Sequence, residues 1–74
     1  MLKIAEGINL DELEKYGFEE EYIFADWAYR KQLVDFEYRE QIVVWRDSRE
    51  VQVEGTELLD TLYDLIQAGI VVKE

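Results

Sequence analysis

The alternation of apolar and polar positions is clearest in the last third of the chain, where it predicts an amphipathic helix over 56–68. The apolar residues fall at i, i+1, i+4, i+7 and i+8, which is one helical face; they are Leu58, Leu59, Leu62, Leu65 and Ile66. Polar residues such as Asp60 and Asp64 occupy the other face. Thr56 stands where an N-cap hydroxyl can accept a free backbone N–H. The rest of the chain must then supply the surface that buries the apolar face.

A second, shorter helix is predicted over 10–16. Asn9 and Glu12 have the spacing of a capping box, and Ile8 and Leu13 have the spacing of a hydrophobic staple. These signals are local and structural, so they indicate a helix and carry no chemistry.

Each predicted helix is followed by a glycine and an apolar residue, Gly17-Phe18 in the first case and Gly69-Ile70 in the second. Glycine adopts the left-handed C-cap conformation easily, and the apolar residue after it folds back on the helix. Residues 71–72 then continue as a short apolar tail, which fits an edge strand.

The middle of the chain reads as strands. The aromatic-rich stretch 22–30 favours a strand, although Ala25 and Ala28 would also tolerate a helix. The next stretch, 33–39, alternates, with Val34, Phe36 and Tyr38 on one side. Two further strands are predicted at 41–46 and 50–54.

Loop length decides which side of the strand at 41–46 is buried, because a shift of one residue exchanges the two faces. A two- or four-residue loop pairs Ile42 and Val44 with the apolar face of 50–54, whereas a three-residue loop pairs Val43 and Trp45 with it. The turn contains no glycine for the left-handed position that three-residue loops favour. We therefore predict Ile42 and Val44 inside and Trp45 on the opposite face.

These elements predict an α+β fold in a single domain, 1–74. A short N-terminal helix precedes a three- or four-stranded antiparallel meander, and the C-terminal amphipathic helix packs on one sheet face. We expect both helices to cover that same face, which gives a two-layer domain.

The composition disfavours an enzyme. The 74 residues include no Cys and no His, and Ser48 is the only serine, so the usual nucleophile and base pairs are missing. The four glycines stand apart, so no phosphate-binding loop is present. Three consecutive glutamates, 19–21, do not wrap a cation as a calcium loop does. We therefore expect no catalytic residue, no cofactor and no metal.

The formal net charge is −10 and is unevenly distributed. Residues 1–26 carry a net −6 and residues 50–74 a net −5, while 27–49 carry a net +1. Such a charge repels nucleic acid and anionic membranes and favours basic partners. No apolar run reaches membrane-spanning length and no signal peptide is recognisable. We expect a cytoplasmic protein that binds another protein, with no direct nucleic-acid or membrane binding.

One function hypothesis places the partner site on the acidic ends. Their carboxylates could present charge as a nucleic-acid backbone does, and so occupy the basic groove of a nucleic-acid-binding enzyme. The candidate residues are Glu12, Glu14, Glu19, Glu20, Glu21, Glu54, Glu57, Asp60 and Asp64. The alternative is an ordinary solvated acidic surface.

A second hypothesis, from a different class, is a structural or assembly role. If both helices cover one sheet face, the other face would carry aromatic side chains, and exposed aromatic patches mark protein interfaces. The candidate residues are Tyr22, Phe24, Trp27 and Trp45. A homodimer through this face would also complete the core of a small domain. The two hypotheses differ in salt response, because charge mimicry weakens with salt and an aromatic interface hardly changes.

Two stretches carry a resemblance. INLDELEKYGF at 8–18 and LDTLYDLIQAGIVVK at 59–73 resemble a loose group of short, mostly uncharacterised proteins of bacterial phages and prophages. The resemblance covers about a third of the chain, and its residues are mainly structural. It implies an accessory role in a mobile element in a host cell, including inhibition of a host defence nuclease, and assigns no binding residue.

Overall fold

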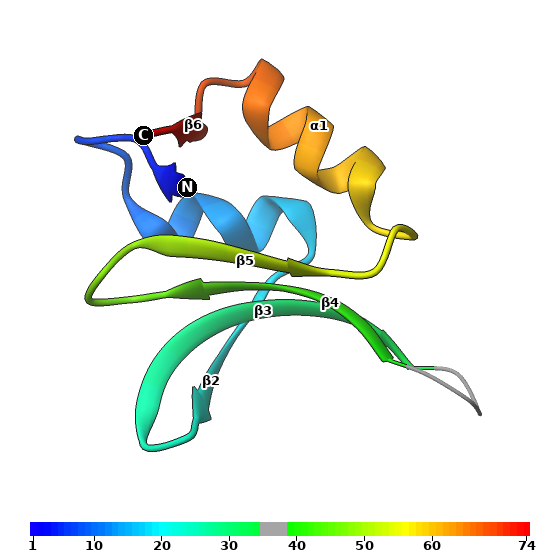
Figure 1. The fold of residues 1–74 in the computed structure, drawn as a ribbon. Coiled ribbons are helices and arrows are strands. Elements are labelled where there is room, and N and C mark those ends of the chain that lie inside the picture. The colour runs from blue at the N-terminus through cyan, green and yellow to red at the C-terminus, as the bar shows by residue number, and fades with distance from the viewer. Residues whose placement is uncertain (35–38) are drawn as a thin grey trace.

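The computed structural model describes residues 1–34 and 39–74, and within them the chain forms a six-stranded antiparallel sheet with a 3-10 helix and an α-helix (Figure 1). The strands lie in the order β2-β3-β4-β5-β1-β6. In chain order the elements are β1 (Leu2–Ile4), the 3-10 helix η1 (Leu10–Tyr16), β2 (Glu19–Ile23), β3 (Asp26–Val34), β4 (Arg39–Trp45), β5 (Glu50–Glu54), α1 (Leu59–Gln67) and β6 (Val71–Lys73). The predicted α+β class is confirmed, with more strands than expected. Among the described residues, no helix has the length and apolar character needed to cross a bilayer.

The predicted meander is the four-stranded part of this sheet, β2 to β5. The two strands beyond it come from the chain ends: β1 pairs with β5, and β6 pairs with β1 at the edge. The ends therefore lie side by side, with the Met1 ammonium group donating to the Glu74 carbonyl at 2.9 Å. The apolar tail at 71–72 is an edge strand, as predicted.

The prediction of one strand over 22–30 is wrong, because a hairpin turn interrupts it at Phe24 and Ala25. Both residues have left-handed backbone angles, with φ of 50° and 63°, and Ile23 pairs with Asp26 across them. Two successive left-handed residues form a two-residue hairpin turn, and Asn-Gly is the sequence that usually forms this turn. Phenylalanine and alanine give no such signal. The glutamates 19–21 form most of β2.

The pairing of β4 with β5 is as predicted. Ile42 pairs with Val53 and Val44 with Val51, across a four-residue connection at 46–49. Ile42 and Val44 are fully buried, and Trp45 points to the opposite face. The predicted strand at 33–39 is shared between β3 and β4, and its residues 35–38, with Phe36 and Tyr38, lie outside the described residues.

The first helix has the predicted bounds, although its geometry is 3-10. The Asn9 side chain accepts from the Asp11 N–H at 3.0 Å, one residue earlier than a capping box requires. The Glu12 carboxylate binds Lys15 at 2.9 Å instead. Gly17 ends the helix with a φ of 89°. Phe18 then folds back as predicted, with its N–H on the Leu13 carbonyl.

The C-terminal helix begins later than predicted, at Leu59, and Thr56 does not cap it. Its end is as predicted, because Gly69 is left-handed and the Ile70 N–H bonds the Leu65 carbonyl at 2.9 Å. Only part of the predicted apolar face is buried. Leu58 and Leu65 are inside and Leu62 is partly buried, whereas Leu59 and Ile66 are 45% and 44% exposed. The buried and partly buried positions 58, 62 and 65 follow the i, i+4, i+7 spacing of one helical stripe, and Leu59 and Ile66 each lie one residue to the side of it.

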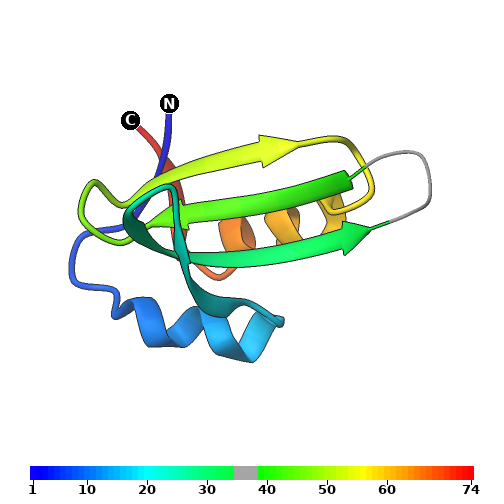
Figure 2. The ribbon, with the colours of Figure 1, turned by 90° about the horizontal axis from the view of Figure 1, so that it is seen from below.

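A single core cluster joins both helices to one sheet face. Leu10 and Leu13 of η1 and Leu58 and Leu65 of α1 belong to it, together with sheet residues that share one face; these are Tyr29, Ile42, Val44 and Val51. The two-layer arrangement is therefore as predicted. On the other side, the β2–β3 hairpin curls beneath β4 and β5, away from the helices (Figures 1 and 2). We name this uncovered side the concave face.

Candidate functional site

The concave face contains a hollow of about 230 Å³. Strand pairing places its strand residues on the side of the sheet away from the helices, and Phe24 joins them from the hairpin tip. The lining residues are Ile23, Phe24, Arg30, Gln41, Val43, Trp45, Gln52 and Glu54. Aromatic, amide and carboxylate groups therefore meet in one concavity, which is the usual composition of a binding site.

Arg30 and Glu21 form a bidentate ion pair on this face. The Arg30 guanidinium donates to both carboxylate oxygens of Glu21, at 3.0 Å from Nε and 2.6 Å from Nη2. The two side chains are 16% and 31% exposed, so the pair is partly shielded from water. Bidentate pairing holds the guanidinium in one orientation and compensates its charge.

Gln41 and Glu54 form a second polar pair in the hollow. The Gln41 Nε2 donates to Glu54 Oε2 at 3.1 Å. The Gln41 Oε1 is buried and accepts no hydrogen bond from any described residue. An amide flip would place this oxygen against a carboxylate, so the Glu54 contact fixes the orientation. A buried amide oxygen without a donor costs about 1–3 kcal/mol.

The four predicted aromatic residues do not share one face. Trp45 and Phe24 line the hollow of the concave face. Tyr22 and Trp27 pair with each other on the other side of the hairpin, where their ring centroids are 5.2 Å apart. The prediction of a single aromatic face is therefore wrong for Tyr22 and Trp27. The physical reason is strand alternation: Ala28 pairs with Trp45, so its neighbour Trp27 faces the other side of the sheet. Tyr22 lies opposite Trp27 and faces that side too.

Tyr22 and Trp27 belong to a small exposed cluster outside the hairpin. The Arg46 guanidinium lies 5.6 Å from the Trp27 ring centroid and 3.9 Å from a Glu20 carboxylate oxygen. Tyr22 is 62% and Trp27 42% exposed. Cation–π contacts of this kind stabilise exposed sites by about 0.5–1 kcal/mol.

The predicted acidic residues separate into groups on different parts of the surface. Glu12 and Glu14 lie on η1, and the glutamates of β2 alternate between its two faces, with Glu19 and Glu21 on one and Glu20 on the other. The remaining four lie on β5, before α1 and on α1; they are Glu54, Glu57, Asp60 and Asp64.

Three of the nine carboxylates form an ion pair within the part of the chain that the structure describes. Glu12 pairs with Lys15, Glu20 with Arg46 and Glu21 with Arg30. These pairs reduce the local charge of the η1–β2 group. Among the described residues, Glu57, Asp60 and Asp64 form no ion pair.

A polar contact beneath η1 was not predicted. The Tyr29 hydroxyl donates to Asp11 Oδ1 at 2.9 Å. Burial raises the pKa of Tyr29 well above its usual value of 10.0, and the Asp11 hydrogen bond raises it further. The two residues line an open depression of about 650 Å³ together with Glu20, Arg46 and Arg49. Only the tertiary fold brings these residues together, so no sequence pattern marks them.

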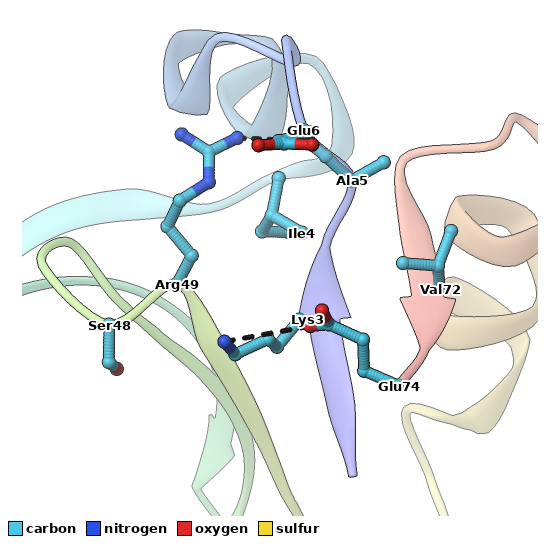
Figure 3. Close-up of a pocket in the computed structure, with 8 residues that line it drawn as sticks. All are labelled: Lys3, Ile4, Ala5, Glu6, Ser48, Arg49, Val72 and Glu74. Carbon is cyan, nitrogen blue, oxygen red and sulfur yellow. Dashed lines mark hydrogen bonds and ion pairs between the residues drawn. The ribbon is translucent and has the colours of Figure 1, made fainter.

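A third hollow, of about 390 Å³, lies where the chain ends meet (Figure 3). Lys3 pairs there with the Glu74 carboxylate at 3.5 Å. Arg49 donates to the carbonyl oxygens of Ala5 and Ile8. Both cations therefore have structural partners that fix β1 and the chain after it.

The described residues contain no group of three carboxylate, histidine or cysteine side chains placed to hold a metal ion. Comparison of the chain with protein-family models, with curated proteins and with solved structures gave no match. The geometry of the concave face and the net charge are therefore the features that bear on function.

Proposed function

We propose that this protein acts by binding a basic partner protein through its concave face. One observation carries the proposal: an uncovered sheet face holds a hollow with exposed aromatic and carboxylate groups, in a chain of net charge −10. Phe24, at 92% exposure, lies at its rim. The left-handed backbone conformation of Phe24 is costly for a residue with a Cβ, and strain of this kind at an exposed tip supports a binding role.

Charge selects the partner. A chain with 18 acidic and 8 basic residues attracts a basic surface from a distance and repels nucleic acid and a second copy of itself. A basic partner with an apolar anchor for the hairpin tip fits both the charge and the aromatic side chains. The resemblance to phage-encoded accessory proteins suggests a bacterial host protein as that partner.

Capture from a bacterial lysate with matched variants tests the proposal. We expect the tagged protein to retain a basic protein at low salt, and Trp45→Ala and Phe24→Ala to lose it. Phe24→Ala does not threaten folding, because its side chain is almost fully exposed. Tyr63→Ala is the matched control, since Tyr63 is a 62% exposed aromatic residue on α1. Equal retention by all variants, or self-association as the only result, would contradict the proposal.

A second proposal uses charge alone. Glu57 precedes α1, Asp60 lies in its first turn and Asp64 lies one turn later, and none of the three forms an ion pair with a described residue. As a DNA mimic, the protein would present these carboxylates to the basic groove of a nucleic-acid-handling enzyme. The triple change Glu57→Gln, Asp60→Asn and Asp64→Asn would then abolish capture, while Trp45→Ala would leave it intact. The concave-face proposal expects the opposite pattern.

A further inference from the structure

We infer that the hollow of the concave face receives an arginine side chain of the partner protein, held by Gln41 and Glu54 and stacked on Trp45. This inference rests on the proposed protein-binding function and specifies its central contact. The hollow of about 230 Å³ is smaller than the roughly 300–1,000 Å³ of sites for small-molecule ligands. Its size therefore suits one side chain.

The polar groups of the hollow favour a ligand that carries hydrogen-bond donors. Gln41 Oε1 is buried and accepts nothing from the described residues, and the contact of Gln41 Nε2 with Glu54 fixes that oxygen in place. Two acceptors, an amide oxygen and a carboxylate, thus lie on neighbouring strands. A ligand with several N–H donors satisfies both at once.

The Glu54 carboxylate favours a cationic ligand in the hollow. Its own cation, Arg30, is compensated by the bidentate contact with Glu21. The Glu54 carboxylate is exposed and forms no ion pair with a described side chain. A cationic ligand therefore gains an attractive contact here, and an anionic ligand meets repulsion.

The aromatic wall distinguishes arginine from lysine. Trp45 is partly buried and lines the hollow beside Val43. A guanidinium group is planar, stacks on an indole ring and keeps its in-plane N–H groups available for oxygen acceptors. An ammonium group is compact and strongly hydrated, so it uses this combination less well.

An NMR titration with short peptides tests the inference. The probe is acetyl-Gly-Arg-Gly-amide, compared with the same peptide containing lysine or citrulline, the neutral relative of arginine. We expect the arginine peptide to shift the indole N–H of Trp45 and the side-chain amide of Gln41. Trp27 lies on the other side of the hairpin, so its indole N–H is an internal control that should not move. The citrulline peptide should bind about tenfold more weakly, because it lacks the charge-assisted hydrogen bonds.

Two variants locate the contact. Gln41→Leu and Glu54→Gln should each weaken arginine-peptide binding about tenfold, whereas Gln67→Leu on α1 should leave it unchanged. Glu54 is exposed, so Glu54→Gln tests the site without risk to folding. Equal binding of the three peptides, equal shifts of both indoles, or no effect of the variants would overturn the inference. If Gln41→Leu and Glu54→Gln capture the partner normally while Trp45→Ala does not, the arginine site is wrong and the proposed function stands.

Discussion

At the scale of single residues, Tyr29 connects the two layers of the fold. Its ring is buried against the helix-side core, and its hydroxyl reaches Asp11 on η1. A phenol in this position is favoured in its neutral form, because burial opposes the phenolate and the hydrogen bond to the carboxylate needs the proton. The raised pKa therefore implies that stability depends on pH in the alkaline range.

We expect the free energy of unfolding to fall above about pH 10 and to fall less in Tyr29→Phe. The folded pKa lies above the unfolded value of 10.0, so the contribution is fully present below that value and is lost as pH rises towards the folded pKa. The loss amounts to about 1.4 kcal/mol per pH unit between the two pKa values. Urea unfolding at a series of pH values measures it. Tyr63→Phe, at an exposed position, is the control and should keep the wild-type dependence; identical curves for all three proteins would exclude the effect.

The residues that sequence predicted correctly are those whose role follows from periodicity. Ile42, Val44 and Trp45 were assigned to the correct faces, since alternation and loop length fix a strand's orientation. Gln41 was not recognised as a site residue, because a polar residue in a strand is ordinary until its partners are known. Its role depends on Glu54, thirteen residues later and on another strand.

At the scale of elements, the β2–β3 hairpin is strained where it is most exposed. Phe24 and Ala25 both adopt positive φ, a conformation that costs a residue with a Cβ about 1–2 kcal/mol. Glycine would remove this cost at either position. The sequence therefore keeps Phe24 at the tip at the expense of stability, which fits a binding role.

We expect Ala25→Gly to raise the free energy of unfolding by about 0.5–1 kcal/mol. Glycine adopts positive φ without strain, but it loses more conformational entropy on folding than alanine does, which offsets part of the gain. Partner capture should not change, because Phe24 remains in place. Chemical denaturation and the capture experiment measure the two effects. A loss of stability would show that the turn is not strained at this residue.

The start of α1 depends on a side chain from β4. The Glu40 carboxylate accepts the N–H groups of Thr56 and Glu57, at 3.0 and 3.1 Å, in the place where the sequence suggests a Thr56 cap. Gly55 makes this approach possible, because a Cβ on it would collide with the Glu40 side chain. A contact between residues so far apart in sequence leaves no local signal.

We expect Gly55→Ala to destabilise the protein more than Gly7→Ala does. Both glycines have positive φ, 83° and 85°, but a Cβ on Gly7 would meet nothing. Gly7→Ala thus measures backbone strain alone, about 1–2 kcal/mol. The additional loss in Gly55→Ala, about 1 kcal/mol or more, measures the displaced Glu40 contacts. Equal losses in thermal or urea unfolding would mean that Glu40 moves aside without cost.

Element types were predicted better than element boundaries. Both helix ends carry strong local signals, Gly17 and Gly69, and both were placed correctly. The hairpin at Phe24 was missed because its turn residues contradict local preference. The candidate site depends on that hairpin. Sequence therefore predicts Phe24, Trp45 and Glu54 as candidate residues, but it does not predict that they line one concave surface.

At the scale of the whole molecule, the high charge shapes stability as well as binding. A compact chain with net charge −10 repels itself, and salt screens this repulsion over a distance of about 10 Å at 0.1 M. The cations counter it locally through pairs such as Glu21 with Arg30. Removing a carboxylate therefore has two opposing effects, one global and one local.

Two variants that each remove one negative charge should distinguish the global effect of self-repulsion from the local effect of ion pairing. Glu14 is exposed and forms no ion pair with a described residue, so Glu14→Gln should stabilise the protein by a few tenths of a kcal/mol at low salt and by almost nothing at high salt. Glu21→Gln relieves the same repulsion but breaks a partly buried bidentate contact, so it should destabilise the protein by about 1–2 kcal/mol at either salt concentration. Thermal unfolding of both variants across a salt series measures the difference. If both variants respond alike, the Glu21–Arg30 contact adds nothing to stability beyond the effect of total charge.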